Sequence, residues 1–239
     1  MVYIQSNEDR SLAHHFDCSC ALYGAVSSAM RYRLTTFDEV SSGKFDALIN
    51  KHLFVGSVEF MREVFRRAGI GDVRVPRNSN RNCEITTLGD AINRILSGET
   101  LFVKPVEIKL FTGAVLNRAN YQYVYDISRD ALVMVYQPFS EEIVSEWRLY
   151  IHNNKIVDSR NYFGDFKISP NYRYAESIVE DNRSEFPCSY TIDIGILENG
   201  DNVVVEFNDM WAIGNYGTDN TLYLRMLRDR YFQIIQNNS

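Results

Sequence analysis

The segment SYTIDIGILENGDNVVVEFND, residues 189–209, constrains the fold more than any other part of the chain. Asn-Gly is the preferred centre of a two-residue type I′ hairpin turn, because both central positions need a positive φ. A turn centred on Asn199-Gly200 places Glu198 opposite Asp201 and fixes the register of two antiparallel strands. One face of this hairpin is then wholly apolar and belongs to a core, with the pairs Ile192 and Phe207, Ile194 and Val205, and Ile196 and Val203.

The other face of the predicted hairpin aligns acidic and amide side chains. Its expected pairs are Gly195 and Val204, Asp193 and Glu206, and Thr191 and Asn208. Like charges directly opposite each other are destabilising unless something compensates them. A Mg²⁺ ion, which prefers carboxylate and amide oxygens, would do so. We therefore predict Asp193, Glu206 and Asn208 as metal ligands, with an exposed acidic face beside Lys or Arg side chains as the alternative.

Cations interrupt two other strand-like segments. The apolar run LFVKPVEIKLFTG, residues 101–113, contains Lys104 and Lys109. A buried strand normally excludes an unpaired ammonium group, so these lysines indicate an anionic ligand. In SEWRLYI, residues 145–151, Glu146, Arg148 and Tyr150 share one face because strand side chains alternate. A lone Arg on a strand is more often a surface ion pair, but with the lysines and the acidic hairpin it indicates cations around a polyphosphate.

A basic segment precedes these strands. It carries six arginines against two acids, Glu63 and Asp72: Arg62, Arg66, Arg67, Arg74, Arg77 and Arg81. One interpretation is a solvated helix face followed by a polar loop. The other is an anion-binding rim, and we expect an anionic acceptor substrate near Arg74 and Arg77 in that case.

The patterning along the chain predicts an α+β protein. Residues 1–80 form a small α/β domain in this prediction, with an amphipathic helix over 58–68 that Ser57 caps and Gly69 ends. A second helix is capped by Thr87 and ends at Gly98. From Thr100 onward, alternating segments predict antiparallel strands, and a last helix covers residues 220–236. The predicted strands are residues 100–104, 121–126, 131–137, 143–151, 155–163, 189–197 and 202–209.

Composition limits the classes of function. A net charge of −6 argues against bulk wrapping of nucleic acid, although a local basic patch can still act. No apolar run approaches the roughly 20 residues that span a bilayer, and the N-terminus lacks a signal-peptide pattern, so we expect a cytoplasmic protein without a membrane partner. Four scattered cysteines fit neither a disulfide framework nor a four-ligand zinc site.

The order of these segments resembles the ATP-grasp superfamily, and within it the clade named for one conserved arginine and two lysines, found in phages and bacteria. The matching segments are FVKP, KLFTG, QPF, SEWRLYI, DIG and VVEFND, over roughly residues 100–217. The resemblance implies an ATP-grasp fold over residues 81–239, with subdomains of about 81–136 and 137–239 that hold ATP between them. Residues 1–80 would be a pre-ATP-grasp domain.

The resemblance also implies a role for each site residue, with ATP and Mg²⁺ as cofactors. Lys104 and Lys109 would bind the phosphates, and Arg148 would lie near the γ-phosphate or an acyl-phosphate, so that Arg148 and Lys109 are the expected catalytic residues. The segment Gln137, Pro138 and Phe139 would lie near the adenine. Glu146 would also contact the nucleotide, and Thr112 and Gly113 would lie in a loop that closes over the phosphates. Asp193, Glu206 and Asn208 would bind Mg²⁺.

Three functions fit this resemblance. The first is a carboxylate–amine ligase, which forms an acyl-phosphate and then an amide, with ADP and phosphate as products. The second is an ATP-dependent enzyme of nucleic-acid ligation, modification or repair, a less favoured choice because neither lysine lies in a Lys-x-Asp-Gly motif. The third is a non-catalytic nucleotide-binding module. If the protein is phage-encoded, we expect it in the host cytoplasm.

Overall fold

The computed structural model describes residues 1–13, 16–71, 73, 83–107 and 110–238. The chain divides into two compact units, residues 1–78 with 143–239 (unit 1) and residues 79–142 (unit 2). Each unit has its own core, so we describe each by itself. The three-part domain division expected from the sequence stays a prediction.

Unit 1 begins with a parallel sheet. Its strands lie in the order β2-β1-β3 and are β1 (Val2–Gln5), β2 (Tyr32–Thr35) and β3 (Leu53–Val55). Parallel neighbours need crossover connections, which are helical here: α1 (Phe16–Ser27), α2 (Phe37–Ser41) and α3 (Asp46–Ile49). Helix α4 (Val58–Arg67) follows β3. As predicted, Ser57 caps α4 by accepting a hydrogen bond from the Phe60 amide, and Gly69 ends it with a φ of 75°.

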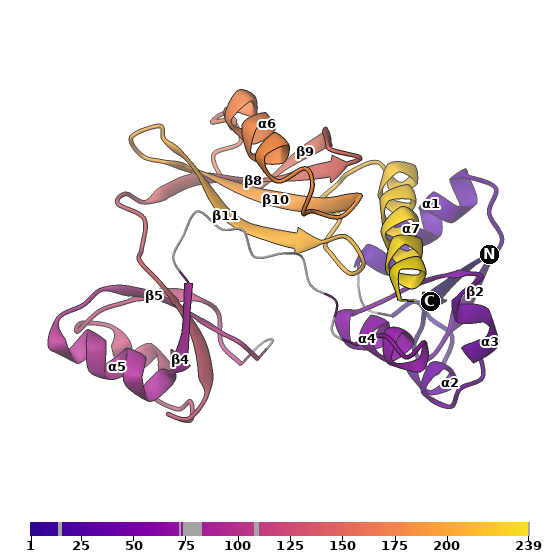
Figure 1. Ribbon diagram of the computed structural model, residues 1–239, viewed down its shortest axis with the longest axis horizontal. Coiled ribbons are helices and arrows are strands. Elements are labelled where there is room, and N and C mark those ends of the chain that lie inside the picture. The colour runs from indigo at the N-terminus through magenta and orange to yellow at the C-terminus, as the bar shows by residue number, and fades with distance from the viewer. Residues whose placement is uncertain (14–15, 72, 74–82, 108–109, 239) are drawn as a thin grey trace. The chain divides into compact units, whose positions relative to one another are not determined.

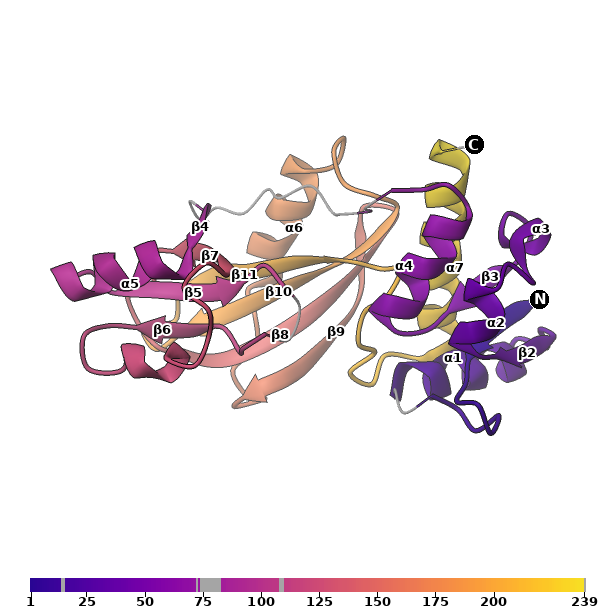
Figure 2. The same cartoon turned by 90° about the horizontal axis from the view of Figure 1, so that it is seen from below.

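The second sheet of unit 1 is antiparallel and carries the predicted hairpin. Its strands lie in the order β11-β10-β8-β9 and are β8 (Ile143–His152), β9 (Lys155–Gly164), β10 (Ser189–Leu197) and β11 (Asn202–Asp209). Helix α6 (Tyr172–Asp181), which the sequence analysis missed, packs on its apolar face (Figures 1 and 2). Its signal was an Asn171 cap before apolar residues at 175, 178 and 179. The opposite face of the sheet is polar.

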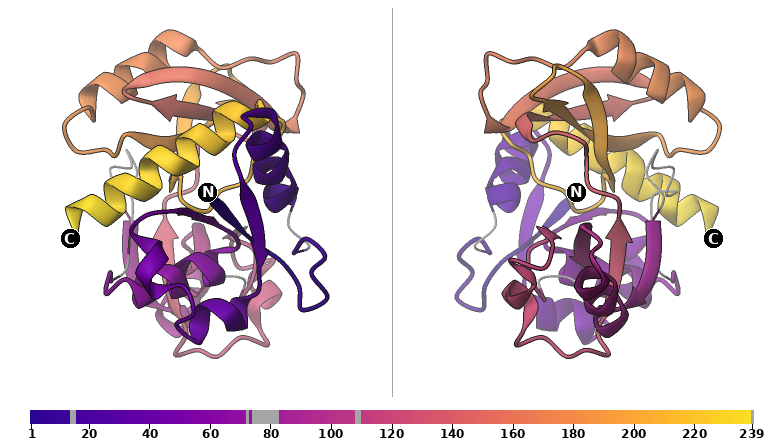
Figure 3. Two further views of the ribbon diagram at one scale, coloured as in Figure 1. Left: turned by 90° about the vertical axis from the view of Figure 1, so that its right-hand side faces the viewer. Right: turned by 90° about the vertical axis from the view of Figure 1, so that its left-hand side faces the viewer.

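Helix α7 (Asn220–Asn237) closes unit 1. Asp219 caps it by accepting hydrogen bonds from the amides of Thr221 and Leu222. The helix packs along α1 and contacts both β3 and β10 (Figure 3). Tyr223 and Tyr231 of this helix are buried in the same core as β1. The last helix predicted from the sequence is therefore confirmed, and it joins the two sheets of unit 1.

Unit 2 is a four-stranded antiparallel sheet covered by one helix. The strands lie in the order β4-β7-β5-β6 and are β4 (Cys83–Thr87), β5 (Leu101–Pro105), β6 (Ala114–Leu116) and β7 (Leu132–Tyr136). Helix α5 (Leu88–Ser97) begins at the predicted Thr87 cap and ends at Gly98, whose φ is 116°. The predicted strand over residues 121–126 is wrong. A 3₁₀ helix, η1 (Tyr121–Val124), lies there, because Asn117 and Asn120 bind nearby backbone groups and only Val124 is buried.

The hairpin turn differs from the prediction. Leu197 pairs with Asp201 around a three-residue loop, within which only Gly200 has a positive φ, so the turn is not type I′. The Asn199 side chain accepts a hydrogen bond from the Asp201 amide, which favours this loop. Near the turn, each β10 residue pairs one position away from the prediction: Ile194 with Val204, Gly195 with Val203, and Ile196 with Asn202.

A β-bulge then restores the predicted register. It lies between Asp193 and Ile194, where β11 contributes one extra residue. Beyond the bulge, the pairs are the predicted ones: Asp193 with Glu206, Ile192 with Phe207, and Thr191 with Asn208. The acidic pair therefore lies where the sequence placed it. Across the described segments, no helix is both long and apolar enough to cross a membrane.

Candidate functional site

Asp193 lies at the centre of the polar face of the second sheet, between two strands. The register places it opposite Arg148 on β8 and opposite Glu206 on β11. Arg148 binds it with two parallel hydrogen bonds, from Nε to Oδ1 at 2.8 Å and from Nη2 to Oδ2 at 2.7 Å. Both side chains are buried, with 5% of Arg148 and 1% of Asp193 exposed. The sequence analysis placed Arg148 on one face of its strand with Glu146 and Tyr150, but it did not predict this ion pair.

The three predicted metal ligands lie together. The Asn208 amide nitrogen donates hydrogen bonds to Asp193 Oδ2 at 3.3 Å and to Glu206 Oε1 at 3.2 Å. Among the described residues no group of three or more His, Cys, Asp or Glu could hold a metal, so the site depends on two carboxylates and an amide. Mg²⁺ takes carboxylate and amide oxygens and usually keeps water and phosphate oxygens as its other ligands. Here Asn208 presents its amide nitrogen to the carboxylates and both oxygens of Asp193 accept hydrogen bonds from Arg148, so the group has the donor types of a Mg²⁺ site but not the arrangement of a bound ion.

Burial and charge set the ionisation of the central pair. Burial raises the pKa of Asp193 to about 6, and the charges of Glu206 and Glu146 act in the same direction, while Arg148 opposes them. Burial is the largest single influence on the pKa of Arg148 and acts to lower it, but the hydrogen bonds and the charge of Asp193, together with Tyr216 and Tyr150, raise that pKa overall. At neutral pH the site therefore holds a charged guanidinium against an ionised carboxylate.

Two tyrosine rings lie against the Arg148 guanidinium. Its central carbon lies 4.6 Å from the ring centroid of Tyr216 and 5.6 Å from that of Tyr162. The two rings stack at 4.9 Å with an interplanar angle of 19°. Tyr162 also donates a hydrogen bond of 2.5 Å to Glu146 Oε2. These contacts leave Arg148 few alternative orientations.

The loop that carries Tyr216 is anchored by its backbone. Tyr150 donates to the carbonyl oxygen of Gly214 at 2.9 Å and also to that of Asn215. The amide of Asn215 donates to Asp17 Oδ1 at 3.0 Å. The sequence analysis missed Tyr162, Gly214 and Tyr216 as site residues. The only signal was Tyr150, which it placed on the same strand face as Arg148.

The predicted phosphate-binding residues belong to unit 2. Lys104 lies on β5, opposite Met134 of β7. Gly113 packs directly on it, because a Cβ atom at position 113 would lie 3.3 Å from Lys104 Cβ. Thr112 precedes Gly113, and Gln137, Pro138 and Phe139 follow directly after β7. Lys109 lies outside the described residues.

The basic segment is only partly described, since Arg74, Arg77 and Arg81 lie outside the described residues. Arg66 binds Glu63 with two hydrogen bonds of 2.7 and 2.6 Å. Arg67 binds Asp46 of α3, with Nε 2.9 Å from Oδ1. Counting acids within the segment alone therefore overstated its free positive charge, because α3 supplies a further partner.

Comparison with protein-family models matches residues 79–226 to an ATP-grasp domain, that of family 2 in the clade named for one arginine and two lysines. Comparison with curated protein sequences gives no match.

Solved structures of ATP-grasp proteins resemble the whole chain. The D-alanine–D-alanine ligase of Bacillus anthracis complexed with ATP has a TM-score of 0.56 at 11% identity, over 100% of this chain and 98% of that one. The RimK domain ATP-grasp protein of Sphaerobacter thermophilus has a TM-score of 0.55 at 9% identity, over 98% of both chains. The ligase PsnB, complexed with precursor peptide PsnA2 and AMPPNP, has a TM-score of 0.52 at 11% identity, over 96% of both chains. The expected α+β, ATP-grasp fold is confirmed.

Proposed function

The chain belongs to family 2 of this arginine-and-two-lysines clade of ATP-grasp domains, and from this membership we propose that it is an ATP-dependent carboxylate–amine ligase. A carboxylate oxygen of one substrate attacks the γ-phosphorus of ATP, which forms an acyl-phosphate and releases ADP. The amine of the second substrate then attacks the acyl carbon, the C–O bond to phosphate breaks, and the amine loses a proton. The products are an amide, ADP and phosphate.

The observation that carries this proposal is the convergence of Asp193, Glu206 and Asn208 beside Arg148. The carboxylates and the amide oxygen would hold Mg²⁺, which supplies charge neutralisation for the phosphoryl oxygens of ATP. Arg148 Nε and Nη2 are engaged with Asp193, and the third nitrogen, Nη1, lies 3.5 Å from the carbonyl oxygen of Gly214; Nη1 is the donor for a phosphoryl oxygen in this proposal. We propose that Arg148 orients the transferred phosphoryl group and stabilises its developing charge.

The residues of unit 2 have the nucleotide roles expected from the sequence in this proposal. Lys104, together with Lys109, binds phosphate oxygens as a point charge. Gly113 allows close backbone approach, and Thr112 lies beside it in the covering loop. Gln137, Pro138 and Phe139 contact the adenine. Glu146, which belongs to unit 1, contacts the nucleotide as well as Tyr162. Excluding water over the phosphates would protect the acyl-phosphate from hydrolysis.

The test measures ATP binding and product release separately. Calorimetric titration with ATP, with and without Mg²⁺, should show Mg²⁺-dependent binding. A panel of amino acids and short peptides should then give ADP and phosphate in equal amounts. Release of AMP and pyrophosphate would contradict the proposal and favour a nucleotidyl-transfer reaction, and ATP binding without any product would favour a binding module.

A matched pair of variants assigns the metal role. Glu206→Gln removes the charge of a proposed ligand and should lower Mg²⁺-dependent turnover by at least about 100-fold. Mutating a residue that only hydrogen-bonds to a metal ligand already costs about 10–100-fold in metal affinity or activity. The control is Glu198→Gln, on the exposed turn of the same hairpin, which should leave turnover unchanged. Normal turnover in Glu206→Gln would exclude the metal site.

A further inference from the structure

A cavity of about 490 Å³ lies between α4 and the segment that follows β11. Its floor is apolar, with Phe65, Ile70, Val73 and Trp211, and its charged lining consists of Arg62 and Arg66. Pockets for small ligands typically measure 300–1,000 Å³ and combine an apolar lining with a few polar groups. The cavity therefore has the size and the chemistry of a site for a small anionic molecule with an apolar body.

The two arginines differ in what they can bind. Arg66 is held by both oxygens of Glu63. Arg62 is exposed and has no hydrogen-bond or ion-pair partner within the part of the chain that the structure describes. A guanidinium offers a planar pair of donors that matches a carboxylate. Arg62 is thus the cation of this cavity that is available for a carboxylate ligand.

Trp211 adds an aromatic ring to the lining of the cavity. Only 9% of this residue is exposed, and its indole nitrogen is buried without a hydrogen-bond partner among the described residues. Its ring contacts Phe65 edge to face, at 5.6 Å and 83°. The nitrogen has almost no accessible surface, so a molecule in the cavity would contact the aromatic ring and not this nitrogen.

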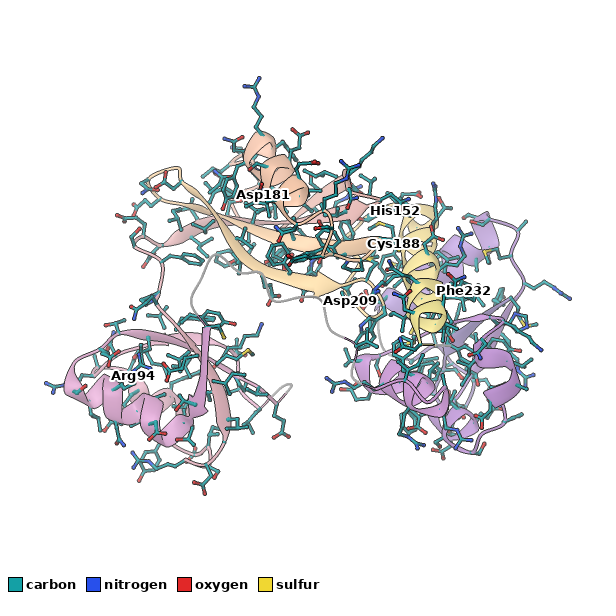
Figure 4. The ribbon with its side chains drawn as sticks, viewed as in Figure 1. Arg94, His152, Asp181, Cys188, Asp209 and Phe232 are labelled. Atoms are coloured by element: carbon teal, nitrogen blue, oxygen red, sulfur yellow. The ribbon has the colours of Figure 1, made fainter. Side chains whose placement is uncertain are left out.

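The cavity begins close to the proposed metal site. Trp211 follows Asn208 by three residues, and three residues span at most about 11 Å. Asp209, at the end of β11, marks the start of this connection (Figure 4). Asp209 is itself fixed by two hydrogen bonds from Arg230, at 2.7 and 2.6 Å. A molecule in the cavity could therefore extend toward the site of phosphoryl transfer.

We propose that this cavity binds the amine substrate, and that this substrate is an α-amino acid with an apolar or aromatic side chain. The side chain contacts Phe65, Ile70 and Trp211, and the carboxylate accepts hydrogen bonds from Arg62. The amine is then the group left to attack the acyl-phosphate. This inference rests on the proposed function only in calling the bound molecule a substrate.

The test is a binding measurement without ATP, on the full chain. Calorimetric titration should detect L-phenylalanine, and should show at least tenfold weaker binding of L-phenylalaninamide, which lacks the carboxylate, and of glycine, which lacks the side chain. Absence of L-phenylalanine binding, or equal binding of the three probes, would overturn the inference.

Two variants locate the carboxylate. Arg62→Gln should weaken the binding of L-phenylalanine at least tenfold and leave the binding of L-phenylalaninamide unchanged. The control is Arg67→Gln, on the same helix but outside the cavity lining, which should bind L-phenylalanine like the wild type. An equal loss in both variants overturns the assignment to Arg62. If L-phenylalanine binds as expected but no amine gives ADP release, the proposed function fails while the cavity assignment stands.

Discussion

The ring of Tyr216 lies 4.6 Å from the guanidinium carbon of Arg148, although the backbone at Tyr216 has a φ of 48°. A left-handed conformation costs a residue with a side chain roughly 1–2 kcal/mol. Such strain persists where the surroundings determine it, and it clusters at functional sites. Here the surroundings are the Tyr162 ring and the hydrogen bonds that fix the loop. We infer that orienting Arg148 is the reason for this conformation.

Two variants of Tyr216 should therefore distinguish the role of its ring from that of its hydroxyl. Tyr216→Phe keeps the stack and should retain turnover within about threefold. Tyr216→Ala removes a cation–π contact worth about 1–2 kcal/mol and should lower kcat about tenfold, with a smaller change in the KM for ATP. Steady-state ADP release measures both constants. A large loss in Tyr216→Phe would show that the hydroxyl, and not the ring, is the active feature.

The buried pair of Arg148 and Asp193 predicts an asymmetry between single and double variants. Removing one partner leaves a buried charge and costs about 3–5 kcal/mol. Arg148→Met should lower the free energy of unfolding by that amount, while adding Asp193→Leu should restore most of it. Urea unfolding of the three proteins tests this. Arg148→Lys should fail to restore turnover, because an ammonium cannot reproduce the two parallel hydrogen bonds.

The sequence predicted the acidic pair because strand alternation is a local property. Asp193 and Glu206 lie opposite each other as expected, although the turn was wrong. The error at the turn moved the pairing by one residue, and the bulge before Ile194 moved it back. A bulge depends on packing across the sheet, so the pattern of a single hairpin does not reveal it.

The contacts that hold the loop of Tyr216 against Arg148 could not be predicted, because they join segments that are distant in the sequence. Asn215 binds Asp17 of α1, and Gly214 binds Tyr150 of β8. No periodic pattern in the sequence links these positions. The predicted strand over residues 121–126 failed for a different reason. Its alternating tyrosines are a strand pattern, but Tyr123 and Tyr125 are 56% and 78% exposed, so no core favours an extended chain there.

Lys104 gives a prediction for unit 2. Lys104→Met deletes the charge and keeps most of the aliphatic stem that lies beside Gly113. If Lys104 binds a phosphate, the affinity for Mg²⁺–ATP should fall about tenfold, a free-energy change of about 1.4 kcal/mol. Lys167→Met, at an exposed position in unit 1, is the control. Unchanged ATP affinity in Lys104→Met would exclude the phosphate role.

The last prediction concerns the pH dependence of stability and involves Glu39 of α2. Its carboxylate accepts hydrogen bonds from Arg10 at 2.6 Å and from the Thr36 amide at 3.2 Å, and its side chain is only 13% exposed. The hydrogen bond from Arg10 is the largest cause that holds its pKa well below the ordinary 4.5. A lowered pKa in the folded state means that the ionised form stabilises the fold above the unfolded pKa.

This stabilisation is lost as the pH falls below about 4.5 toward the lower pKa of the folded state. Glu39→Gln should therefore lower the free energy of unfolding at pH 7 by about 1.5–3 kcal/mol, the range for a hydrogen bond to a charged group. The difference from the wild type should shrink steadily between pH 5 and pH 3 in urea unfolding. Asp38→Asn, at the exposed neighbouring position of the same helix, should show no such trend. A Glu39→Gln difference that stayed constant with pH would mean that packing or helix capping, and not charge, is what Glu39 contributes.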